Sequence, residues 1–158
     1  MVRTVYEGNL ITPDGSFAIL VSRWNDLITS RLLEGAIDAL KRHGIEPNTS
    51  IDIIWAPGAY ELPLVAQRIA ETQKYRAIIV LACVIKGGTP HFDFIASEVS
   101  KGLANVGLQT NLPITFGVLT TNSIEQALER AGTKMGNKGV EAAMAAVEMV
   151  NLFDSLAR

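Results

Sequence analysis

The segment of this sequence with the clearest chemistry is Lys86–His91, which reads Lys-Gly-Gly-Thr-Pro-His and follows a long apolar run. The two glycines permit a tight turn with exposed backbone N–H groups, and Thr89 and Pro90 are typical of the first positions of a helix. Exposed amides, a helix amino end and the Lys86 ammonium favour an anion, most naturally a phosphate group. An ordinary strand-to-helix turn explains these residues equally well. The spacing matches neither glycine-rich nucleotide motif, so a nucleotide does not follow.

His91 is the candidate for proton transfer. It falls in the first turn of the expected helix, and the amino end of a helix favours a neutral imidazole that accepts and returns a proton. A lone histidine is more often structural, but a position after a strand favours a catalytic role. The other histidine, His43, follows Lys41 and Arg42 at the end of a helical segment, where cations complement the helix dipole. We therefore interpret His43 as a helix cap.

Aromatic, acidic and basic side chains follow the other apolar runs. Trp24, followed by the amide Asn25, offers a flat face for a planar heterocycle, although a lone tryptophan more often packs in a core. Glu61 could hold hydroxyl groups through charge-assisted hydrogen bonds, or could complement a helix dipole. Arg130 is available for bidentate contact with a phosphate, and a solvated helix charge is the alternative.

The residue inventory excludes several other kinds of site. Two histidines and one cysteine stand at unrelated positions, so we expect no metal centre. Cys83 lies inside an apolar run and is interpreted as an inert, small hydrophobic side chain that cannot form an internal disulfide. The chain also lacks the Gly-x-Ser-x-Gly motif of a hydrolase nucleophile.

Composition indicates a single domain over residues 1–158. Lysine and arginine number 14 and acidic residues 16, so a net charge of −2 gives no attraction to nucleic acid or to an anionic membrane. Hydrophobic residues make up 48% and charged residues 19%, which excludes disorder and indicates that other subunits cover part of the apolar surface. The run Ala77–Ile85 is shorter than the ~20 residues of a membrane span, and the first residues lack a secretory apolar core. We therefore expect a cytoplasmic protein.

Apolar runs of strand length alternate with segments of helical period. The expected strands are residues 17–22, 51–55, 77–85 and 113–119. The expected helices span residues 26–43, 59–70, 90–106 and 137–150, with a short one opened by Asn122 or Ser123. This alternation predicts an α/β fold, a three-layer α/β/α sandwich with a four-stranded parallel sheet, whose ligands lie beyond the carboxyl ends of the strands. The run 77–85 is apolar throughout, which predicts a central strand.

Residues Val2–Tyr6 have the composition of a strand but no neighbouring strand in this scheme. They could add to the sheet of another subunit, or they could form a frayed terminus.

Four blocks of the sequence resemble the signatures of the lumazine synthase family. They are Ala56-Pro-Gly-Ala-Tyr-Glu-Leu-Pro63, Cys83-Val-Ile-Lys-Gly-Gly-Thr-Pro-His-Phe-Asp93, Phe116-Gly-Val-Leu-Thr-Thr121 and Gln126-Ala-Leu-Glu-Arg-Ala-Gly132 with Gly136-Asn-Lys-Gly139. They occur in order, and the resemblance extends from about Phe17 to Val150. Several blocks at compatible spacing are far more specific than any one of them.

The resemblance implies an enzyme of riboflavin biosynthesis, a transferase of the penultimate step. Such an enzyme condenses 5-amino-6-(D-ribitylamino)uracil with 3,4-dihydroxy-2-butanone 4-phosphate to give 6,7-dimethyl-8-ribityllumazine, inorganic phosphate and water, without a cofactor. The fold it implies is flavodoxin-like. Its partners are then its small-molecule substrates, further copies of the chain in a homopentamer or a 60-subunit icosahedral capsid, and riboflavin synthase. The compact segment Ala131–Gly139 favours the capsid, because added residues there resemble pentamer-only members.

By resemblance, Trp24 stacks on the pyrimidine with Asn25 beside it, while Ala59 and Glu61 line the ribityl pocket. His91 transfers protons. Gly88 and Thr89 match the loop that holds the phosphate, and Arg130 matches the arginine that binds it. Lys86 joins these site residues on the loop chemistry described above. The positions that a neighbouring subunit contributes to the same site are Phe116 and Lys138.

The sequence departs from the family pattern at a few of these positions. Trp24 stands where many members have phenylalanine, and it offers a larger stacking face. Cys83 and Val84 match the strand end that faces the pyrimidine through backbone groups, but Cys83 replaces a common threonine. Gly88 stands where alanine or an acidic residue is frequent.

Three other classes of protein share this architecture. A flavin-binding electron-transfer module needs a Ser/Thr-rich loop where Ser22–Asn25 stands, and a receiver domain needs an aspartate where Ile85 and Lys86 stand. A catalytically silent shell protein would not need His91, Arg130 and Glu61, so their presence favours an enzyme.

Overall fold

The sheet at the centre of the molecule positions everything else. The computed structural model describes residues 1–158, and its main sheet has four parallel strands in the order β2-β1-β3-β4. Their bounds are Ser16–Ser22 for β1, Ile51–Ala56 for β2, Tyr75–Ile85 for β3 and Ile114–Thr121 for β4. Residues 77–83 of β3 are all buried between β1 and β4, which confirms the prediction of a central strand.

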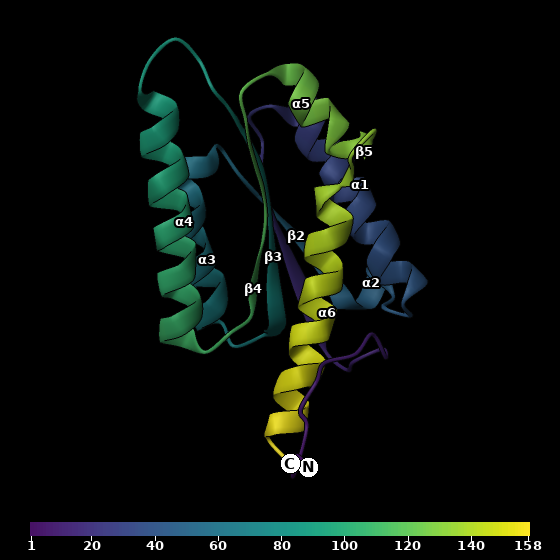
Figure 1. Cartoon of the computed structure of the whole chain (residues 1–158). Coiled ribbons are helices and arrows are strands. Elements are labelled where there is room, and N and C mark those ends of the chain that lie inside the picture. Colours follow the sequence, from purple (N-terminus) through teal and green to yellow (C-terminus); the bar gives the residue numbers. More distant parts are fainter.

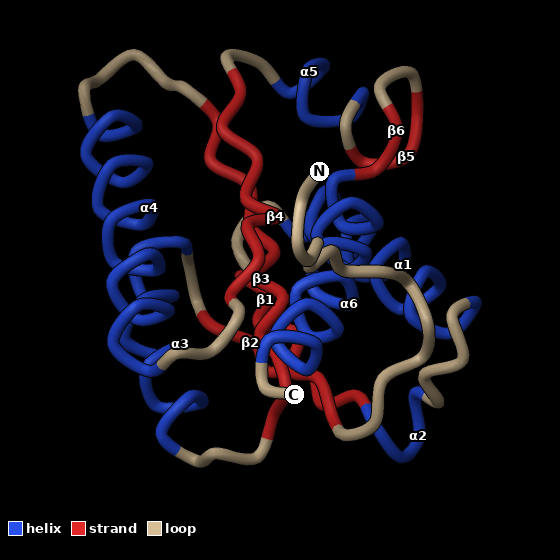
Figure 2. The backbone as a smooth tube through the Cα atoms, turned by 60° about the horizontal axis from the view of Figure 1, so that its bottom comes forward, coloured by secondary structure: helices blue, strands red, loops and turns tan.

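Helices cover both faces of this sheet (Figure 1, Figure 2). The helices α1 (Asp26–Arg42) and α6 (Lys138–Leu156) pack on one face, and α3 (Leu62–Glu71) and α4 (His91–Thr110) pack on the other. Side chains alternate along each strand, so Phe17 and Ile19 enter the first layer while Ala18 and Leu20 enter the second. The predicted flavodoxin-like three-layer sandwich is confirmed.

Short elements connect these layers. They are α2 (Pro47–Ser50), the 3₁₀ helix η1 (Ala59–Glu61), α5 (Ile124–Glu129) and the hairpin β5 (Ala131–Thr133) with β6 (Gly136–Asn137). Ser123 caps α5, as expected, because its Oγ accepts a hydrogen bond of 3.2 Å from the backbone N of Gln126. The hairpin was not expected from the sequence, and it depends on Gly132 and Gly136, whose φ angles are 108° and 79°.

The start of α4 corrects one local prediction. The helix begins at His91 with Pro90 at the cap position, and Thr89 makes no capping hydrogen bond. Pro90 has φ −71° and ψ 1°, so it lies just outside the helix rather than in its first turn. Gly87 and Gly88 do not adopt positive φ, so the backbone conformation of this pair does not require glycine.

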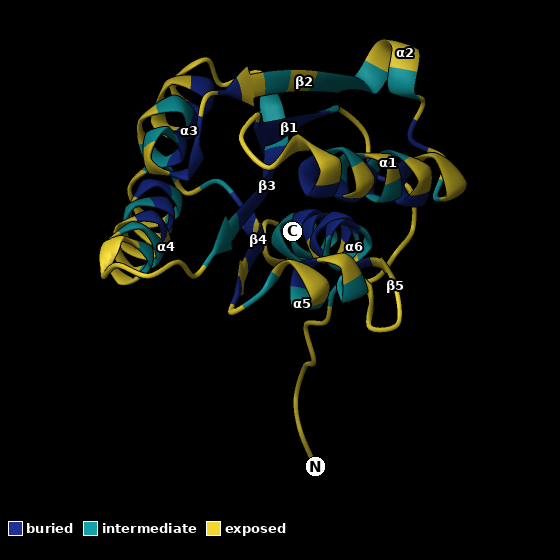
Figure 3. Cartoon of the chain, turned by 90° about the horizontal axis from the view of Figure 1, so that it is seen from above, coloured by how far each residue is buried: buried dark blue, intermediate teal, exposed yellow.

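Residues 1–15 lie outside the sheet, and Figure 3 shows the amino-terminal residues running away from the body of the molecule as an exposed segment. Val2, Val5 and Tyr6 are exposed and pair with no strand of this chain. Pairing with the sheet of another subunit and a frayed terminus therefore both stay predictions for this segment. No helix combines the length and the apolar character that crossing a membrane requires.

Candidate active site

A cleft of about 540 Å³, here called the central cleft, opens at the carboxyl ends of β1 and β3, where the sheet topology predicted a ligand site. It is bounded by η1 and by the first turn of α4. Seven of the predicted site residues line it: Trp24, Asn25, Ala59, Glu61, Cys83, Val84 and His91. Tyr60, Ile85 and Ile95 complete the lining. The structure therefore brings together residues from four separate parts of the sequence.

Hydrogen bonds to neighbouring strand ends fix the segment that carries Trp24. The backbone N of Arg23 donates to the Ala56 carbonyl at 2.8 Å, and the backbone N of Trp24 donates to the Pro57 carbonyl at 3.0 Å. These bonds continue the β1–β2 pairing past the end of β1. The indole of Trp24 is 64% exposed, so one aromatic face remains available to a ligand.

Asn25 connects β1 to β3. It adopts a left-handed backbone conformation with φ 63° and stands at the cap position of α1, but its side chain does not cap that helix. Instead its Nδ2 donates to the Cys83 carbonyl at 2.8 Å. The side-chain bond occupies the Cys83 carbonyl and holds the floor of the cleft together.

Glu61 is positioned by the turn between β2 and α3. Its Oε1 accepts a hydrogen bond of 3.0 Å from the backbone N of Gly58, at the start of η1. The other carboxylate oxygen has no hydrogen-bond partner within the chain. That oxygen is free to accept hydrogen bonds from ligand hydroxyls, which are strong when the acceptor is ionised.

Cys83 is almost fully buried at the end of β3. Burial raises the pKa of its thiol to about 11, so the side chain is a neutral thiol near pH 7. A protonated, buried thiol is a poor nucleophile. This finding agrees with the interpretation of Cys83 as a small hydrophobic side chain rather than a reactive group.

His91 is the first residue of α4 and lies exposed at the rim of the central cleft. Its imidazole makes no hydrogen bond within the chain, so both ring nitrogens remain open to a ligand or to water. Ile95, one helical turn further on, packs below it in the cleft lining. The imidazole therefore has the access that a proton-transfer group needs.

The loop before His91 stays open. Residues 86–90 are exposed, and Figure 1 shows the chain arching beyond the sheet between β3 and α4. The backbone N of Lys86 donates to the Thr121 carbonyl at 2.8 Å, which is the last tie to the sheet. No atom lies within 4 Å of the place where a Cβ of Gly87 or Gly88 would stand. The glycine pair thus leaves room beside the backbone that nothing in this chain fills.

A second cleft of about 450 Å³, here called the edge cleft, lies against β4, the edge strand of the sheet. Its lining comprises Phe116, Val118, Leu119, Thr120, Thr121, Arg130, Met135, Lys138 and Glu141. Six predicted site residues do not line the central cleft. Lys86, Gly88 and Thr89 lie on the open loop and line neither cleft, whereas Phe116, Arg130 and Lys138 lie together in the edge cleft. The two clefts have no lining residue in common.

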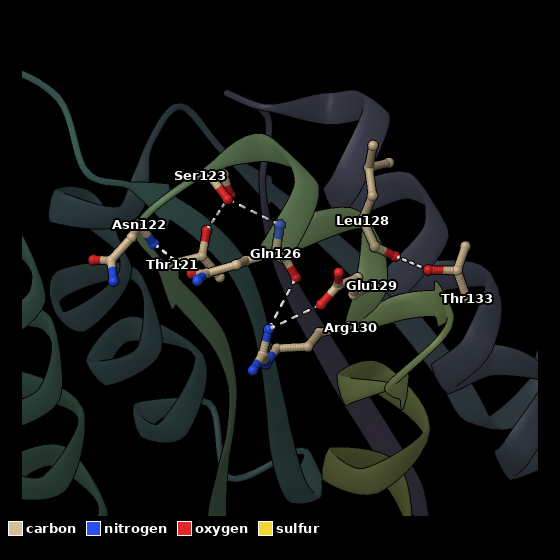
Figure 4. A network of polar contacts seen from close by, with 8 residues as sticks. All are labelled: Thr121, Asn122, Ser123, Gln126, Leu128, Glu129, Arg130 and Thr133. Carbon is tan, nitrogen blue, oxygen red and sulfur yellow. Dashed lines mark hydrogen bonds and ion pairs between the residues drawn. The ribbon is translucent and has the colours of Figure 1, made fainter.

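A network of polar contacts holds Arg130 in the edge cleft (Figure 4). Its Nη1 donates to the Gln126 carbonyl at 3.2 Å and lies 4.0 Å from the Glu129 carboxylate. The carbonyl of Arg130 in turn accepts a hydrogen bond of 2.9 Å from the backbone N of Lys138. The guanidinium is therefore fixed to the end of α5, and the backbone of Lys138 at the start of α6 is bonded to the same residue. An arginine and a lysine in one cleft favour a phosphate ligand.

Sequence reasoning missed a few residues of these clefts. Tyr60 lies between the predicted Ala59 and Glu61, and Ile95 lies four positions after His91. Glu141 lies three positions after Lys138 on α6. The spacing of three or four residues on one helix was the available signal for Ile95 and Glu141.

The two clefts differ in the chemistry they offer. The central cleft presents an aromatic face, a carboxylate and an imidazole, and its lining contains no lysine or arginine. The edge cleft presents a guanidinium and an ammonium group. No group of three or more histidine, cysteine or acidic side chains is arranged to hold a metal ion. The arrangement suits a planar, hydroxylated heterocycle in one cleft and a phosphate ester in the other.

Comparison with protein families agrees with this chemistry. A family model described as 6,7-dimethyl-8-ribityllumazine synthase matches residues 14–154. The match includes every residue that lines either cleft. The chain therefore belongs to the 6,7-dimethyl-8-ribityllumazine synthase family.

Proposed function

We propose that the central cleft of one subunit and the edge cleft of a neighbouring subunit together form the active site of this enzyme. The chain is a transferase that condenses 5-amino-6-(D-ribitylamino)uracil with 3,4-dihydroxy-2-butanone 4-phosphate, in the penultimate step of riboflavin biosynthesis. Members of the family act on small molecules and typically assemble into oligomers. The observation that carries the proposal is the separation of the two kinds of ligand group between two clefts with no common residue.

The central cleft binds the aminouracil. Its pyrimidine ring stacks on the exposed face of Trp24, beside Asn25 and above the strand end formed by Cys83 and Val84. The ribityl chain extends over Ala59 toward the free carboxylate oxygen of Glu61. An indole face and an ionised acceptor match an aromatic ring that carries a polyol.

The phosphate of the second substrate binds between the open loop and the edge cleft. Lys86 and the backbone amides of Gly88 and Thr89 approach it from one subunit. From the neighbouring subunit, the Arg130 guanidinium provides a bidentate contact and the Lys138 ammonium a second charge. Phe116 of that subunit closes the site against water.

His91 moves the protons of the reaction. The amine of the uracil attacks the ketone, and loss of water gives an imine. A proton then leaves carbon, and the C–O bond to phosphate breaks with its electron pair departing on phosphate. The elimination leaves an enol, which takes up a proton at its terminal carbon and becomes a ketone with a new methyl group. The ribityl-bearing nitrogen attacks this carbonyl carbon, and a second water leaves as the ring closes. Each step moves a proton and none moves electrons to an external carrier, so we expect no cofactor.

Two effects supply the rate enhancement. Proton transfer through His91 contributes about 10²–10⁴-fold. Holding the two substrates together contributes more, since effective molarities reach about 10⁵–10⁸ M.

Mixed oligomers test whether the site is shared. At substrate concentrations far below KM, we expect His91→Ala and Arg130→Gln alone to keep no more than about a tenth of wild-type activity, because each impairs one half of every site. Co-expression of both variants in one cell should then restore about a quarter of wild-type activity, because a quarter of the sites combine two intact halves in a random cyclic assembly. Lumazine absorbance measures the turnover. Failure of the mixture to exceed the separate variants would place both residues in one chain's site.

The same division of the site supports a homopentamer. A head-to-tail interface in a closed ring gives each subunit one half of two sites. The hairpin of β5 and β6 makes a compact connection before α6, which favours twelve such rings in a 60-subunit capsid over a free pentamer. Exposed apolar residues in Val2–Tyr6 favour pairing of this segment with another subunit. Analytical ultracentrifugation separates the two assembly states.

The remaining predictions concern the wider context of the chain. Residues 1–158 act as one domain, a proposal supported by the two helical layers that share one sheet. Riboflavin synthase, which consumes the lumazine product, is the proposed protein partner. The cytoplasmic location stays a prediction from the sequence.

A further inference from the structure

Gly58 occupies a position where the backbone does not require glycine. Its φ and ψ angles are −144° and −179°, an extended conformation that any residue adopts. The residue is buried and lies between the end of β2 and η1. The reason for a glycine must therefore lie in what surrounds it.

The indole of Trp24 fills the space where a side chain at position 58 would stand. A Cβ built on Gly58 would lie 2.6 Å from Cζ3 and 3.2 Å from Cδ2 of this ring, and it would also collide with Cε3. Real Cβ contacts are essentially never shorter than 3.0 Å. The six-membered part of the indole therefore rests directly on the Gly58 backbone.

Gly58 also holds the second group of the central cleft. Its backbone N–H donates to Oε1 of Glu61 at 3.0 Å. The preceding residue, Pro57, accepts the hydrogen bond from the backbone N of Trp24. One residue thus lies next to the indole, which occupies the space of its absent side chain, and also donates its N–H to the carboxylate.

We propose that Gly58 is a positioning residue that sets the spacing between the Trp24 ring and the Glu61 carboxylate. This inference rests on the proposed function, in which the ring stacks on the pyrimidine and the carboxylate holds the ribityl chain. A rigid substrate ring with a polyol attached at one point fits only one such spacing. Gly58 therefore determines the affinity for the aminouracil and leaves the phosphate substrate, held by other residues, unaffected.

The Gly58→Ala variant tests this role. The indole is largely exposed, so it can shift away from the added methyl group while the fold persists. Displacement of binding groups by about 1 Å costs up to about 100-fold, so we expect kcat/KM for the aminouracil to fall about 10- to 100-fold. The KM for the butanone phosphate should stay within about twofold of the wild-type value, because no group that binds it has moved.

A double-variant cycle with Trp24→Phe isolates the contact. Phenylalanine lacks the outer part of the indole that meets the added methyl group, so Gly58→Ala should cost much less in the Trp24→Phe background. Gly107→Ala in α4 is the matched control, since its added Cβ meets no atom closer than 3.4 Å and lies outside both clefts. Equal costs of Gly58→Ala in both backgrounds would overturn the proposal.

A binding measurement separates this inference from the proposed function. The chain has two tryptophans, so Trp55→Phe leaves Trp24 as the only fluorescent indole. In that background the aminouracil should quench Trp24 emission, and Gly58→Ala should weaken the binding about 10-fold or more. Absence of quenching with glycine at 58 would contradict the proposed stacking itself. Quenching with unchanged affinity after Gly58→Ala would overturn only the positioning role of Gly58. Loss of the folded circular dichroism spectrum in Gly58→Ala would also overturn the positioning role, because it would show that Gly58 is needed for folding.

Discussion

The central cleft and the edge cleft are built by different means. Hydrogen bonds between the ends of three strands fix the central cleft, through Arg23, Trp24 and Asn25. The edge cleft depends instead on a six-residue helix and a short hairpin beside the edge strand β4. The first presents a rigid aromatic and apolar surface, and the second presents two cations.

This difference matches the ligand that the proposed function gives to each cleft. A neutral planar ring gains from contact with apolar surface and from a preorganised stacking face, which the residues at the carboxyl ends of the strands provide. A phosphate needs cationic side chains that would be costly to bury deep in the core, so they lie at the margin of the fold. Neither cleft alone presents both the aromatic face and the paired cations. The comparison supports our proposal that a second copy of the chain completes the site.

Removal of the imidazole tests the catalytic side of the comparison and should have the largest effect. His91→Ala should lower kcat about 10²–10⁴-fold, because general acid–base assistance is lost, while the KM of each substrate changes only a few-fold. His43→Gln is the matched control. His43 bonds the Ala39 carbonyl at the end of α1, away from both clefts, so its kinetics should match wild type. Wild-type kcat in His91→Ala would remove the imidazole from the mechanism.

The thiol of Cys83 tests whether the floor of the central cleft is closed. Because burial raises the pKa of this thiol to about 11, the thiolate fraction at pH 8 is about 10²-fold lower than for a free cysteine. A thiol-specific chromogenic reagent at pH 8 should therefore label the folded protein at least about 10²-fold more slowly than the protein in guanidinium chloride. Rapid labelling of the folded enzyme would show that the strand end is open, and Cys83→Ala gives the unlabelled background.

The charge of Arg130 tests the phosphate side of the comparison. Arg130→Gln should weaken inorganic phosphate and the butanone phosphate about 10- to 100-fold, since a charge-assisted hydrogen bond contributes about 1.5–3 kcal/mol. The KM for the aminouracil should stay within about twofold. Lys41→Gln removes a positive charge outside both clefts and is the control. Unchanged phosphate affinity, measured by calorimetry, would exclude Arg130 from that role.

The cap of α5 gives the smallest expected effect. Ser123→Ala removes the hydrogen bond to the backbone N of Gln126, which costs about 1 kcal/mol of helix stability. The Gln126 carbonyl holds the guanidinium of Arg130, so phosphate affinity should fall only a few-fold. Ser123→Asp keeps an acceptor at the cap and should restore most of the affinity. An effect on the KM of the aminouracil instead would show that the two clefts are coupled within one chain.

Much of the fold follows from short-range patterns in the sequence. The apolar run 77–85 became the central strand, and the periodic residues Ile28 and Leu32 became the buried face of α1. The hairpin after α5 was missed because its strands span three and two residues, too short for an alternating pattern. The start of α4 was misplaced because proline suits both the cap and the first helical position.

The candidate site was only partly predictable. Seven residues expected in the site share the central cleft, because each lies in the last residues of a strand or shortly after one, and parallel strands end at one edge of the sheet. The role of Gly58 could not be predicted from the sequence, because glycine is common in a turn before a helix. Only the structure shows that the indole of Trp24 occupies the space of its absent side chain. The sequence shows that Glu141 follows Lys138 by three positions on one helix, but only the structure shows that both residues line the edge cleft.

The sequence by itself determined which chemical groups this protein possesses and which local elements carry them. Periodicity and capping act over a few residues, so a linear pattern contains that information. Only the tertiary structure decided that His91 and Arg130 line different clefts. That separation depends on the strand order β2-β1-β3-β4, which leaves β4 at the edge with α5 beside it. The strand order results from packing between distant segments, and no local pattern specifies it.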